Sequence, residues 1–308
     1  MFPRPRYALR EFTTAEGKME ERVQWTANGL RFAGIIEFPQ DMTPGERRPA
    51  FLALHGFGSS KESAMIRTVT RMLTSLGYVA LRFDMRGCGE SEGQRGRVIC
   101  LEQVLDTAGA LEFLAGTGHV EPERIGVFGH SFGAAVAVYA AGTNARIAAC
   151  ISSGGWGHGE KKFRKQHASP AAWERFSAMM QEGRRRARRG ESMMVPRFDI
   201  VPIRPELRGN LAPGSILEFP FEVVESMYGF TANDVVGRIA PRPLLLLHPS
   251  NDTVTPTEQS IDLFMHAGQP TDLHLFADVD HFLFSDANPM LHSVVRDWLA
   301  RYVPLRNA

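Results

Sequence analysis

The chain has 308 residues, of which 44% are hydrophobic and 22% are charged, a composition typical of a globular protein with one large domain or two small ones. Its formal net charge of +1 gives no overall reason to expect nucleic acid, a membrane surface or another polyanion as a partner. No stretch approaches the roughly 18 apolar residues that a membrane span requires, and no apolar segment follows the basic N-terminal residues as in a secretory signal, so we expect a cytoplasmic protein.

The residue types that commonly bind metals are scattered along the chain. Its ten histidines show no clustered ligand spacing, and its three cysteines, Cys88, Cys100 and Cys150, lie far apart. An odd number of widely spaced cysteines suits neither a disulfide framework nor a zinc site. We therefore expect reduced thiols, with Cys88 the more exposed because it lies in a glycine-rich loop, and we expect neither a metal nor a cofactor.

The first predicted element is a β-hairpin. Residues 21–27 and 30–38 are rich in β-forming side chains. Asn28 and Gly29 join them, and this dipeptide tolerates the positive φ angles of a type I′ turn.

After the hairpin, apolar strands and helical segments alternate along the chain. This rhythm indicates βαβ crossovers, and therefore an α/β fold with a mostly parallel central sheet and helices on both faces. The predicted strands are 50–55, 78–83, 124–128, 147–151, 243–248 and 272–276, and the predicted helices are 65–76, 98–114, 132–141, 256–267 and 289–302.

The alternation of strands and helices is interrupted by residues 154–234, which we call the inserted block. This block contains a basic helical stretch followed by a proline-rich passage. Because the strands resume after it, we interpret it as a helical lid inserted into one domain rather than as a second domain. The expected division is a core of residues 1–153 and 235–308 with a lid of residues 154–234.

The pentapeptide Gly129-His130-Ser131-Phe132-Gly133 lies between a predicted strand and a predicted helix. A G-x-S-x-G motif in that position is typical of a nucleophile elbow, a sharp turn that lifts the serine hydroxyl above the edge of the sheet. Small flanking residues let the strand and helix backbones pass closely. The motif therefore predicts Ser131 as a nucleophile.

A serine nucleophile needs a base, and the base needs an orienting carboxylate. Asp252 and His281 each follow a predicted strand, so both should lie at the same sheet edge as Ser131. We predict Ser131, Asp252 and His281 as a catalytic triad. Asp278 and Asp280 are alternative acids, but their closeness to His281 in the sequence makes the required geometry awkward. For Asp252, a turn or helix-capping role could coexist with the catalytic one.

An oxyanion intermediate requires two N–H donors. We expect them from the amides of Phe132, which follows the nucleophile, and of Phe57, in the glycine-containing loop after the first apolar strand. His55 and His130 flank this region. His130 is a candidate substrate contact, although a structural role is the favoured interpretation of both histidines.

From about residue 21 to its end, the chain resembles the α/β-hydrolase superfamily. The resemblance rests on residues 55–58, 86–91, the elbow, 251–252 and 280–281, which match in order and spacing. Within the superfamily the chain is similar to serine esterases and peptidase-like hydrolases that carry a lid after the sixth strand. Some members of the superfamily use an aspartate nucleophile, so Ser131 favours chemistry through an acyl-enzyme.

The inserted block is both basic and rich in large apolar side chains. Residues 161–190 contain ten Lys or Arg and two Glu, so a cationic lid that attracts carboxylate or phosphate groups is one interpretation and a solvated helix face is the favoured one. Aromatic residues are not interleaved with the arginines, which argues against nucleic acid. Trp156 and Trp173 are candidates for lining an apolar acyl or alcohol pocket.

These features predict a serine hydrolase that cleaves a carboxylic ester or a related small-molecule acyl compound. A peptidase or amidase, or a hydrolase of C–C bonds in ketone-bearing substrates, would use the same residues. A ligand-binding receptor on a hydrolase fold is the non-enzymatic alternative. We expect no nucleic-acid or membrane partner, and the sequence leaves a homodimer open.

Overall fold

The computed structural model of the chain describes residues 19–285 and 288–305. The predicted core domain begins at residue 1, so its first 18 residues, with the basic N-terminal segment, lie outside the described residues. Within the described part of the chain, no helix is long and apolar enough to cross a membrane.

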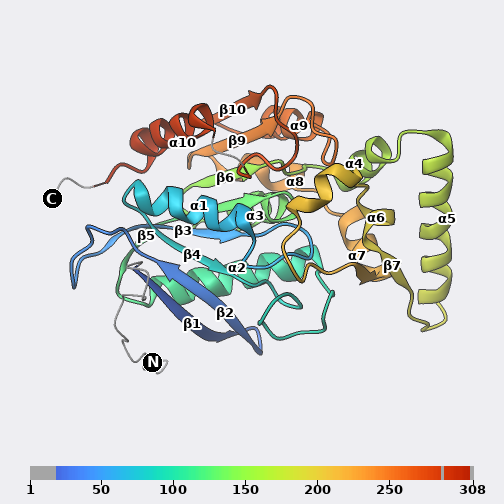
Figure 1. Cartoon of the computed structure of the whole chain (residues 1–308), viewed down its shortest axis with the longest axis horizontal. Coiled ribbons are helices and arrows are strands. Elements are labelled where there is room, and N and C mark those ends of the chain that lie inside the picture. Colours follow the sequence, from blue (N-terminus) through green and yellow to red (C-terminus); the bar gives the residue numbers. More distant parts are fainter. Residues whose placement is uncertain (1–18, 286–287, 306–308) are drawn as a thin grey trace.

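Eight strands form the central sheet: β1 (Glu20–Ala27), β2 (Leu30–Glu37), β3 (Arg48–Leu54), β4 (Val79–Phe83), β5 (Val120–His130), β6 (Cys150–Ser153), β9 (Leu244–Pro249) and β10 (Thr271–Phe276). Their order is β1-β2-β4-β3-β5-β6-β9-β10 (Figure 1). β2 pairs antiparallel with both β1 and β4, and the remaining pairs in this sheet are parallel. The predicted mostly parallel sheet is confirmed.

The helices beside this sheet are α1 (Ala64–Ser75), α2 (Cys100–Ala115), α3 (Phe132–Thr143), α9 (Glu258–His266) and α10 (Pro289–Tyr302). One hydrophobic cluster joins α1 and α10 to one face of the sheet, and a second cluster joins α2, α3 and α9 to the other face. Within β3, Phe51 belongs to the first cluster and Leu52 to the second, because successive strand residues point to opposite faces. Helices on both faces are thus confirmed.

The opening hairpin has the predicted turn. Asn28 and Gly29 have φ angles of 51° and 74°, and Ala27 pairs with Leu30 directly across them. These angles fit a type I′ turn, whose twist matches that of the flanking strands.

The strand before the inserted block lies later than predicted. Residues 147–151 were expected to form it, whereas β6 is Cys150–Ser153. Ser152 and Ser153 extend the strand although they are polar, and both are fully buried. A prediction from apolar residues alone ends at Ile151 and misses the part of the strand that reaches the edge of the sheet.

The inserted block contains α4 (Gly159–Gln166), α5 (Pro170–Ala187), β7 (Met194–Pro196), α6 (Arg197–Ile200), η1 (Pro205–Asn210), β8 (Glu218–Pro220), α7 (Phe221–Tyr228) and the start of α8 (Asn233–Val236). It lies at one end of the central sheet, with α5 outermost (Figure 1). The block is not purely helical, because β7 and β8 pair antiparallel through Val195 and Phe219.

The inserted block and the sheet share one hydrophobic core. Phe163 of α4 and Phe219 of β8 belong to the same cluster of buried residues as Phe32 and Leu52 of the sheet. The expected boundary after residue 234 falls inside α8, which packs on α3. The division into core and lid therefore stays a proposal.

All three cysteines are buried free thiols. The expectation that Cys88 is more exposed is wrong: its side chain is covered because the loop after β4 folds inward around Asp84, with Cys88 N–H bonded to the carbonyl of Met85. Burial raises the pKa of Cys88 to about 12, so the thiol is protonated at neutral pH.

Candidate active site

Ser131 occupies a sharp turn between β5 and α3. Its backbone angles, φ 54° and ψ −115°, lie outside the common regions for a residue with a side chain. A Cβ atom on Gly129 would overlap the carbonyl of Gly133, and one on Gly133 would overlap the carbonyl of Leu54. The two glycines therefore permit the close passage of strand and helix on which this turn depends.

His281 lies between Ser131 and Asp252. Its Nε2 is 2.8 Å from Ser131 Oγ, and its Nδ1 is 2.8 Å from Asp252 Oδ2. Asp252 follows β9 and His281 follows β10, so three chain segments bring these groups to one edge of the sheet. The side chains of His281 and Asp252 are almost completely buried.

The Asp252 carboxylate is held by several donors. Oδ1 accepts hydrogen bonds from the amides of Val254 and Thr255, both at 2.7 Å. Oδ2 faces His281 Nδ1 and lies 3.3 Å from His248 Nε2. Burial alone would raise the pKa of Asp252, but the charge of His281 and the hydrogen bonds from both histidines outweigh burial and lower it. The carboxylate is therefore ionised at neutral pH.

His248, which no motif of the sequence marks, contacts Asp252. Its Nε2 lies 3.0 Å from the carbonyl of Thr255, which can only accept, so Nε2 carries the proton. Its Nδ1 lies 2.6 Å from Ser260 Oγ. The sequence places His248 only four residues before Asp252, and the turn between them brings the two side chains together.

Asp280 points away from the imidazole of His281. Its Oδ1 accepts hydrogen bonds from the amides of Thr253 and His281, and its Oδ2 accepts them from Thr253 Oγ1 and Arg204. Asp278, the other alternative acid, lies in a turn with φ 59°. The geometry therefore favours Asp252 as the partner of His281.

Of the two expected oxyanion donors, Phe132 directly follows Ser131 and Phe57 lines the same cavity as Ser131. Phe132 is the first residue of α3, so its N–H has no acceptor within the helix. Phe57 lies in the loop after β3, and its ring stacks on Phe219 with centroids 4.0 Å apart. The carbonyl of Phe57 accepts a hydrogen bond of 2.7 Å from Arg197, which fixes the loop from the side of the inserted block.

The two histidines near these donors, His55 and His130, contact different groups. His55 is buried, and its Nε2 accepts from the amide of Met85, which leaves Nδ1 to donate to the carbonyl of Gly56. His130 lies beside His281, with ring centroids 5.1 Å apart. Burial, reinforced by the charge of His281, lowers the pKa of His130 well below its ordinary value, so this ring is neutral.

A cavity of about 40 Å³ adjoins Ser131 and His281. Its lining is mostly apolar, as is typical of small-molecule sites, and a large part of it comes from the inserted block between residues 197 and 212. No motif of the sequence marks this segment. The lining residues are Gly56, Phe57, Ser59, Ser63, Met65, His130, Ser131, Arg197, Val201, Ile203, Asn210, Leu211, Ala212, Val254, His281 and Phe282.

The structure does not bring the two candidate tryptophans into this lining. Trp156 is buried and packs against Phe132, with ring centroids 5.8 Å apart. Trp173 lies on α5, where the guanidinium of Arg164 covers its ring. The candidate substrate contacts of the block are therefore the residues of 197–212.

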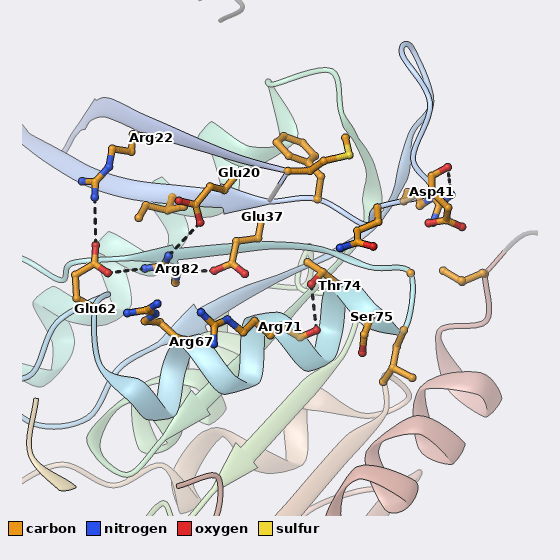
Figure 2. A pocket seen from close by; sticks show the side chains of 18 residues that line it. Glu20, Arg22, Glu37, Asp41, Glu62, Arg67, Arg71, Thr74, Ser75 and Arg82 are labelled. Carbon is orange, nitrogen blue, oxygen red and sulfur yellow. Dashed lines mark hydrogen bonds and ion pairs between the residues drawn. The ribbon is translucent and has the colours of Figure 1, made fainter. Parts of the chain in front are cut away.

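A different cavity of the described residues has a much larger volume, about 1210 Å³ (Figure 2). It lies beside β1, β2, β4 and α1, and no histidine or cysteine of the described residues lines it. Its charged side chains largely pair with one another: Arg82 contacts Glu37 and Glu62, and Glu62 also contacts Arg22. The smaller cavity is the one lined by Ser131 and His281, whose side chains are in hydrogen-bond contact.

The arginine-rich end of α5 is paired and exposed. Arg184 contacts Glu225 of α7, and Arg185 and Arg186 both contact Glu182. Hydrogen bonds from these two arginines lower the pKa of Glu182 to about 2. This arrangement fits a solvated helix face.

Within residues 19–285 and 288–305, no group of three His, Cys, Asp or Glu side chains is placed to hold a metal.

Comparison with known proteins gives a family and several distant relatives. The model of the alpha/beta hydrolase family matches residues 51–291. The chain is 25% identical to the acyltransferase drtE of Aspergillus calidoustus, over 74% of this chain and 78% of that protein. It is 25% identical to the polyketide transferase grgF of Penicillium sp, over 90% and 95%, and 26% identical to the thiohydrolase aneE of Aspergillus aculeatus, over 83% and 84%.

The fold also matches solved structures. The crystal structure of the alpha/beta hydrolase GrgF from Penicillium sp. sh18 superimposes with a TM-score of 0.74 and 22% identity, covering 92% of this chain and 98% of that one. At this identity the likeness shows a shared fold.

Proposed function

The chain belongs to the alpha/beta hydrolase family, and from this premise we propose that it is a serine hydrolase that cleaves a carboxylic ester, a thioester or a related acyl compound. The observation that carries the proposal is the continuous chain of hydrogen-bond contacts Ser131–His281–Asp252, with 2.8 Å at each step. This arrangement can activate a hydroxyl that is otherwise a poor nucleophile at neutral pH.

In the proposed reaction, Ser131 Oγ attacks the acyl carbonyl while His281 Nε2 takes its proton. Asp252 holds the imidazole by Nδ1 and stabilises the imidazolium that forms. The amides of Phe57 and Phe132 donate to the oxyanion, and loss of one such donor typically costs about 3 kcal/mol of transition-state stabilisation. His281 then protonates the leaving group, and water activated by the same base releases the acid.

A second candidate is acyl transfer to an alcohol or amine through the same acyl-enzyme. The names of the relatives favour it, since they include an acyltransferase and a polyketide transferase. The enclosure of His281, which is 2% exposed, also favours it by limiting the access of water to the base. Incubation with a thioester in the presence and absence of an alcohol separates the two: hydrolysis gives only the free acid, whereas transfer gives a new ester.

Labelling with a fluorophosphonate tests the proposed nucleophile. We expect the native protein to be modified at Ser131, which peptide mass spectrometry locates, and Ser131→Ala to remain unmodified. Ser75→Ala, at the far end of α1, is the matched control and should be labelled like the wild type. Failure to label the folded native protein would reject the serine hydrolase and favour a ligand-binding role for the fold.

A further inference from the structure

Arg197 places a positive charge inside the cavity that contains Ser131. It is the first residue of α6, its side chain is 4% exposed, and it lines the same cavity as Ser131 and His281. Burial lowers the pKa of Arg197 to about 10, so the guanidinium is still protonated at neutral pH.

No carboxylate of the described residues lies within ion-pair distance of this guanidinium. Its Nη2 donates to the carbonyl of Phe57 at 2.7 Å and its Nη1 to the carbonyl of Ile216 at 3.0 Å. Within the described chain, Nε has no hydrogen-bond partner. Two neutral carbonyls and the ring of Phe57, whose centroid lies 5.3 Å from the guanidinium carbon, thus hold the group in place without a counterion.

Two other buried cations of the molecule, in contrast, have carboxylate partners. Lys61 contacts the carboxylates of Asp84 and Glu90 at 2.7 and 2.6 Å. Arg82 contacts Glu37 and Glu62. A buried charge without a counterion is strongly unfavourable for the fold, so its retention at Arg197, beside the proposed nucleophile, points to a use in binding.

The surroundings of Arg197 make an anion the fitting ligand. The neighbouring lining residues Phe57, Val201 and Ile203 are apolar, so water screens the charge poorly and an anion entering the cavity would be attracted strongly. A guanidinium presents donors in a planar fork that matches the two oxygens of a carboxylate.

We propose that Arg197 binds a carboxylate carried by the acyl part of the substrate, so that the preferred substrates are esters or thioesters of dicarboxylic half-acids. This inference rests on the proposed serine hydrolase and names its substrate class. The chain between the carboxylate and the scissile carbonyl must be short, because Arg197 and Ser131 line the same small cavity.

Matched ester pairs test this substrate class. The monoethyl esters of malonate, succinate and glutarate are compared with ethyl 3-methylbutanoate, 4-methylpentanoate and 5-methylhexanoate, in which an isopropyl group replaces the carboxylate. We expect the wild type to favour at least one half-ester over its neutral counterpart by about tenfold or more in kcat/KM. The preference should vanish in Arg197→Met and survive in part in Arg197→Lys.

The same esters are used to protect Ser131 from a fluorophosphonate, so the test does not depend on turnover. Half-esters should slow labelling of the wild type more than their neutral counterparts do, and Arg197→Met should lose this difference. Arg175→Met, which removes an exposed charge of α5, is the control for long-range electrostatics and should retain the preference.

The outcomes separate the two proposals. If Ser131 is labelled but half-esters are neither preferred nor protective in the wild type, the role of Arg197 is wrong and the serine hydrolase stands. If Arg197→Met slows both members of each pair equally, Arg197 only positions the Phe57 loop. If Ser131 of the folded protein is never labelled, the proposed function itself fails.

Discussion

At the scale of single residues, the carboxylate of Asp252 is distinguished from its neighbours by what it contacts. It faces His281 Nδ1, whereas Asp280 is bound to Thr253 and Arg204. Both acids lie near His281 in space, Asp280 as its neighbour in the chain and Asp252 from 29 residues earlier, and the direction of the side chain distinguishes them.

Asp252→Asn should lower kcat by about 10³–10⁴-fold with KM little changed, because the amide no longer stabilises the imidazolium or holds its tautomer. Steady-state hydrolysis of an activated ester measures this. Asp280→Asn is the matched control, and we expect a much smaller loss because its carboxylate does not face the ring. Equal losses in the two variants would contradict the assignment of Asp252.

We expect His248 to position Asp252, since its Nε2 lies 3.3 Å from Asp252 Oδ2. His248→Ala should lower kcat by about tenfold or somewhat more, the usual effect of losing a hydrogen bond to a charged group. The acid limb of the pH–rate profile should also move to higher pH, because a carboxylate with fewer donors holds the imidazolium proton more tightly. His248→Gln, which retains an N–H donor, should recover part of both effects. A purely structural role predicts an unchanged pH profile.

Much of the site could be predicted because its residues lie in recognisable local sequence patterns. Ser131 lies in a recognisable motif, and Asp252 and His281 directly follow apolar strands. Arg197 lies in no such pattern. It comes near Ser131 only because β7 and β8 fold back toward the loop of Phe57. Contacts of this kind depend on packing over long sequence separations, which periodicity and motifs do not report.

At the scale of elements, α4 contains a lysine that its environment does not compensate. Lys162 is buried, with Nζ 3.9 Å from the centroid of the Phe163 ring and 4.6 Å from that of Trp156. Within the described residues its Nζ has no hydrogen-bond partner. Burial lowers the pKa of Lys162 from 10.5 to about 7.

The lowered pKa of Lys162 determines whether the free energy of unfolding rises or falls with pH. Between about pH 10.5 and 7 the unfolded chain binds the proton and the folded chain does not, so the free energy of unfolding falls by about 1.4 kcal/mol for each pH unit lowered. Below about pH 7 both states bind it, and the loss is constant. Lys162→Met should therefore be more stable than the wild type near pH 7, with an advantage that shrinks as the pH rises to 10.

Urea unfolding at several pH values measures this difference. The exposed neighbour Lys161, which pairs with Asp262, provides the control variant Lys161→Met. The stability of this control relative to wild type should change little with pH. If Lys162→Met shows an equally flat difference, the amine of Lys162 is not held neutral in the folded state.

Regular elements could be predicted far better than the inserted block. Parallel strands buried on both faces are continuous apolar runs, and helix α10 matches its predicted range of 289–302. The short pair β7 and β8 could not be predicted, since each strand has only three residues and two of the six are proline. Pairing with each other, rather than local propensity, makes these segments strands.

At the scale of the whole molecule, the shared core predicts that sheet and inserted block unfold together. Phe163, Phe219, Phe32 and Leu52 belong to one cluster, so the block has no separate core to keep it folded. We expect one thermal transition, with equal midpoints by far-UV circular dichroism and tryptophan fluorescence. Trp173→Phe, which removes the probe on α5, should leave the fluorescence midpoint close to that of the wild type. Two resolved transitions would instead identify the block as an independent unit.

Hydrogen bonds between the inserted block and the loop after β3 couple the lining of the cavity to the position of that loop. Arg197 donates to the carbonyl of Phe57, and the amide of Ile216 donates to the carbonyl of Gly58 at 2.9 Å. A change in the block that removed Arg197 or displaced Ile216 would take these bonds from the loop that carries the proposed oxyanion donor Phe57. The segment that lines the cavity therefore also holds the loop beside Ser131, and the two cannot be altered independently.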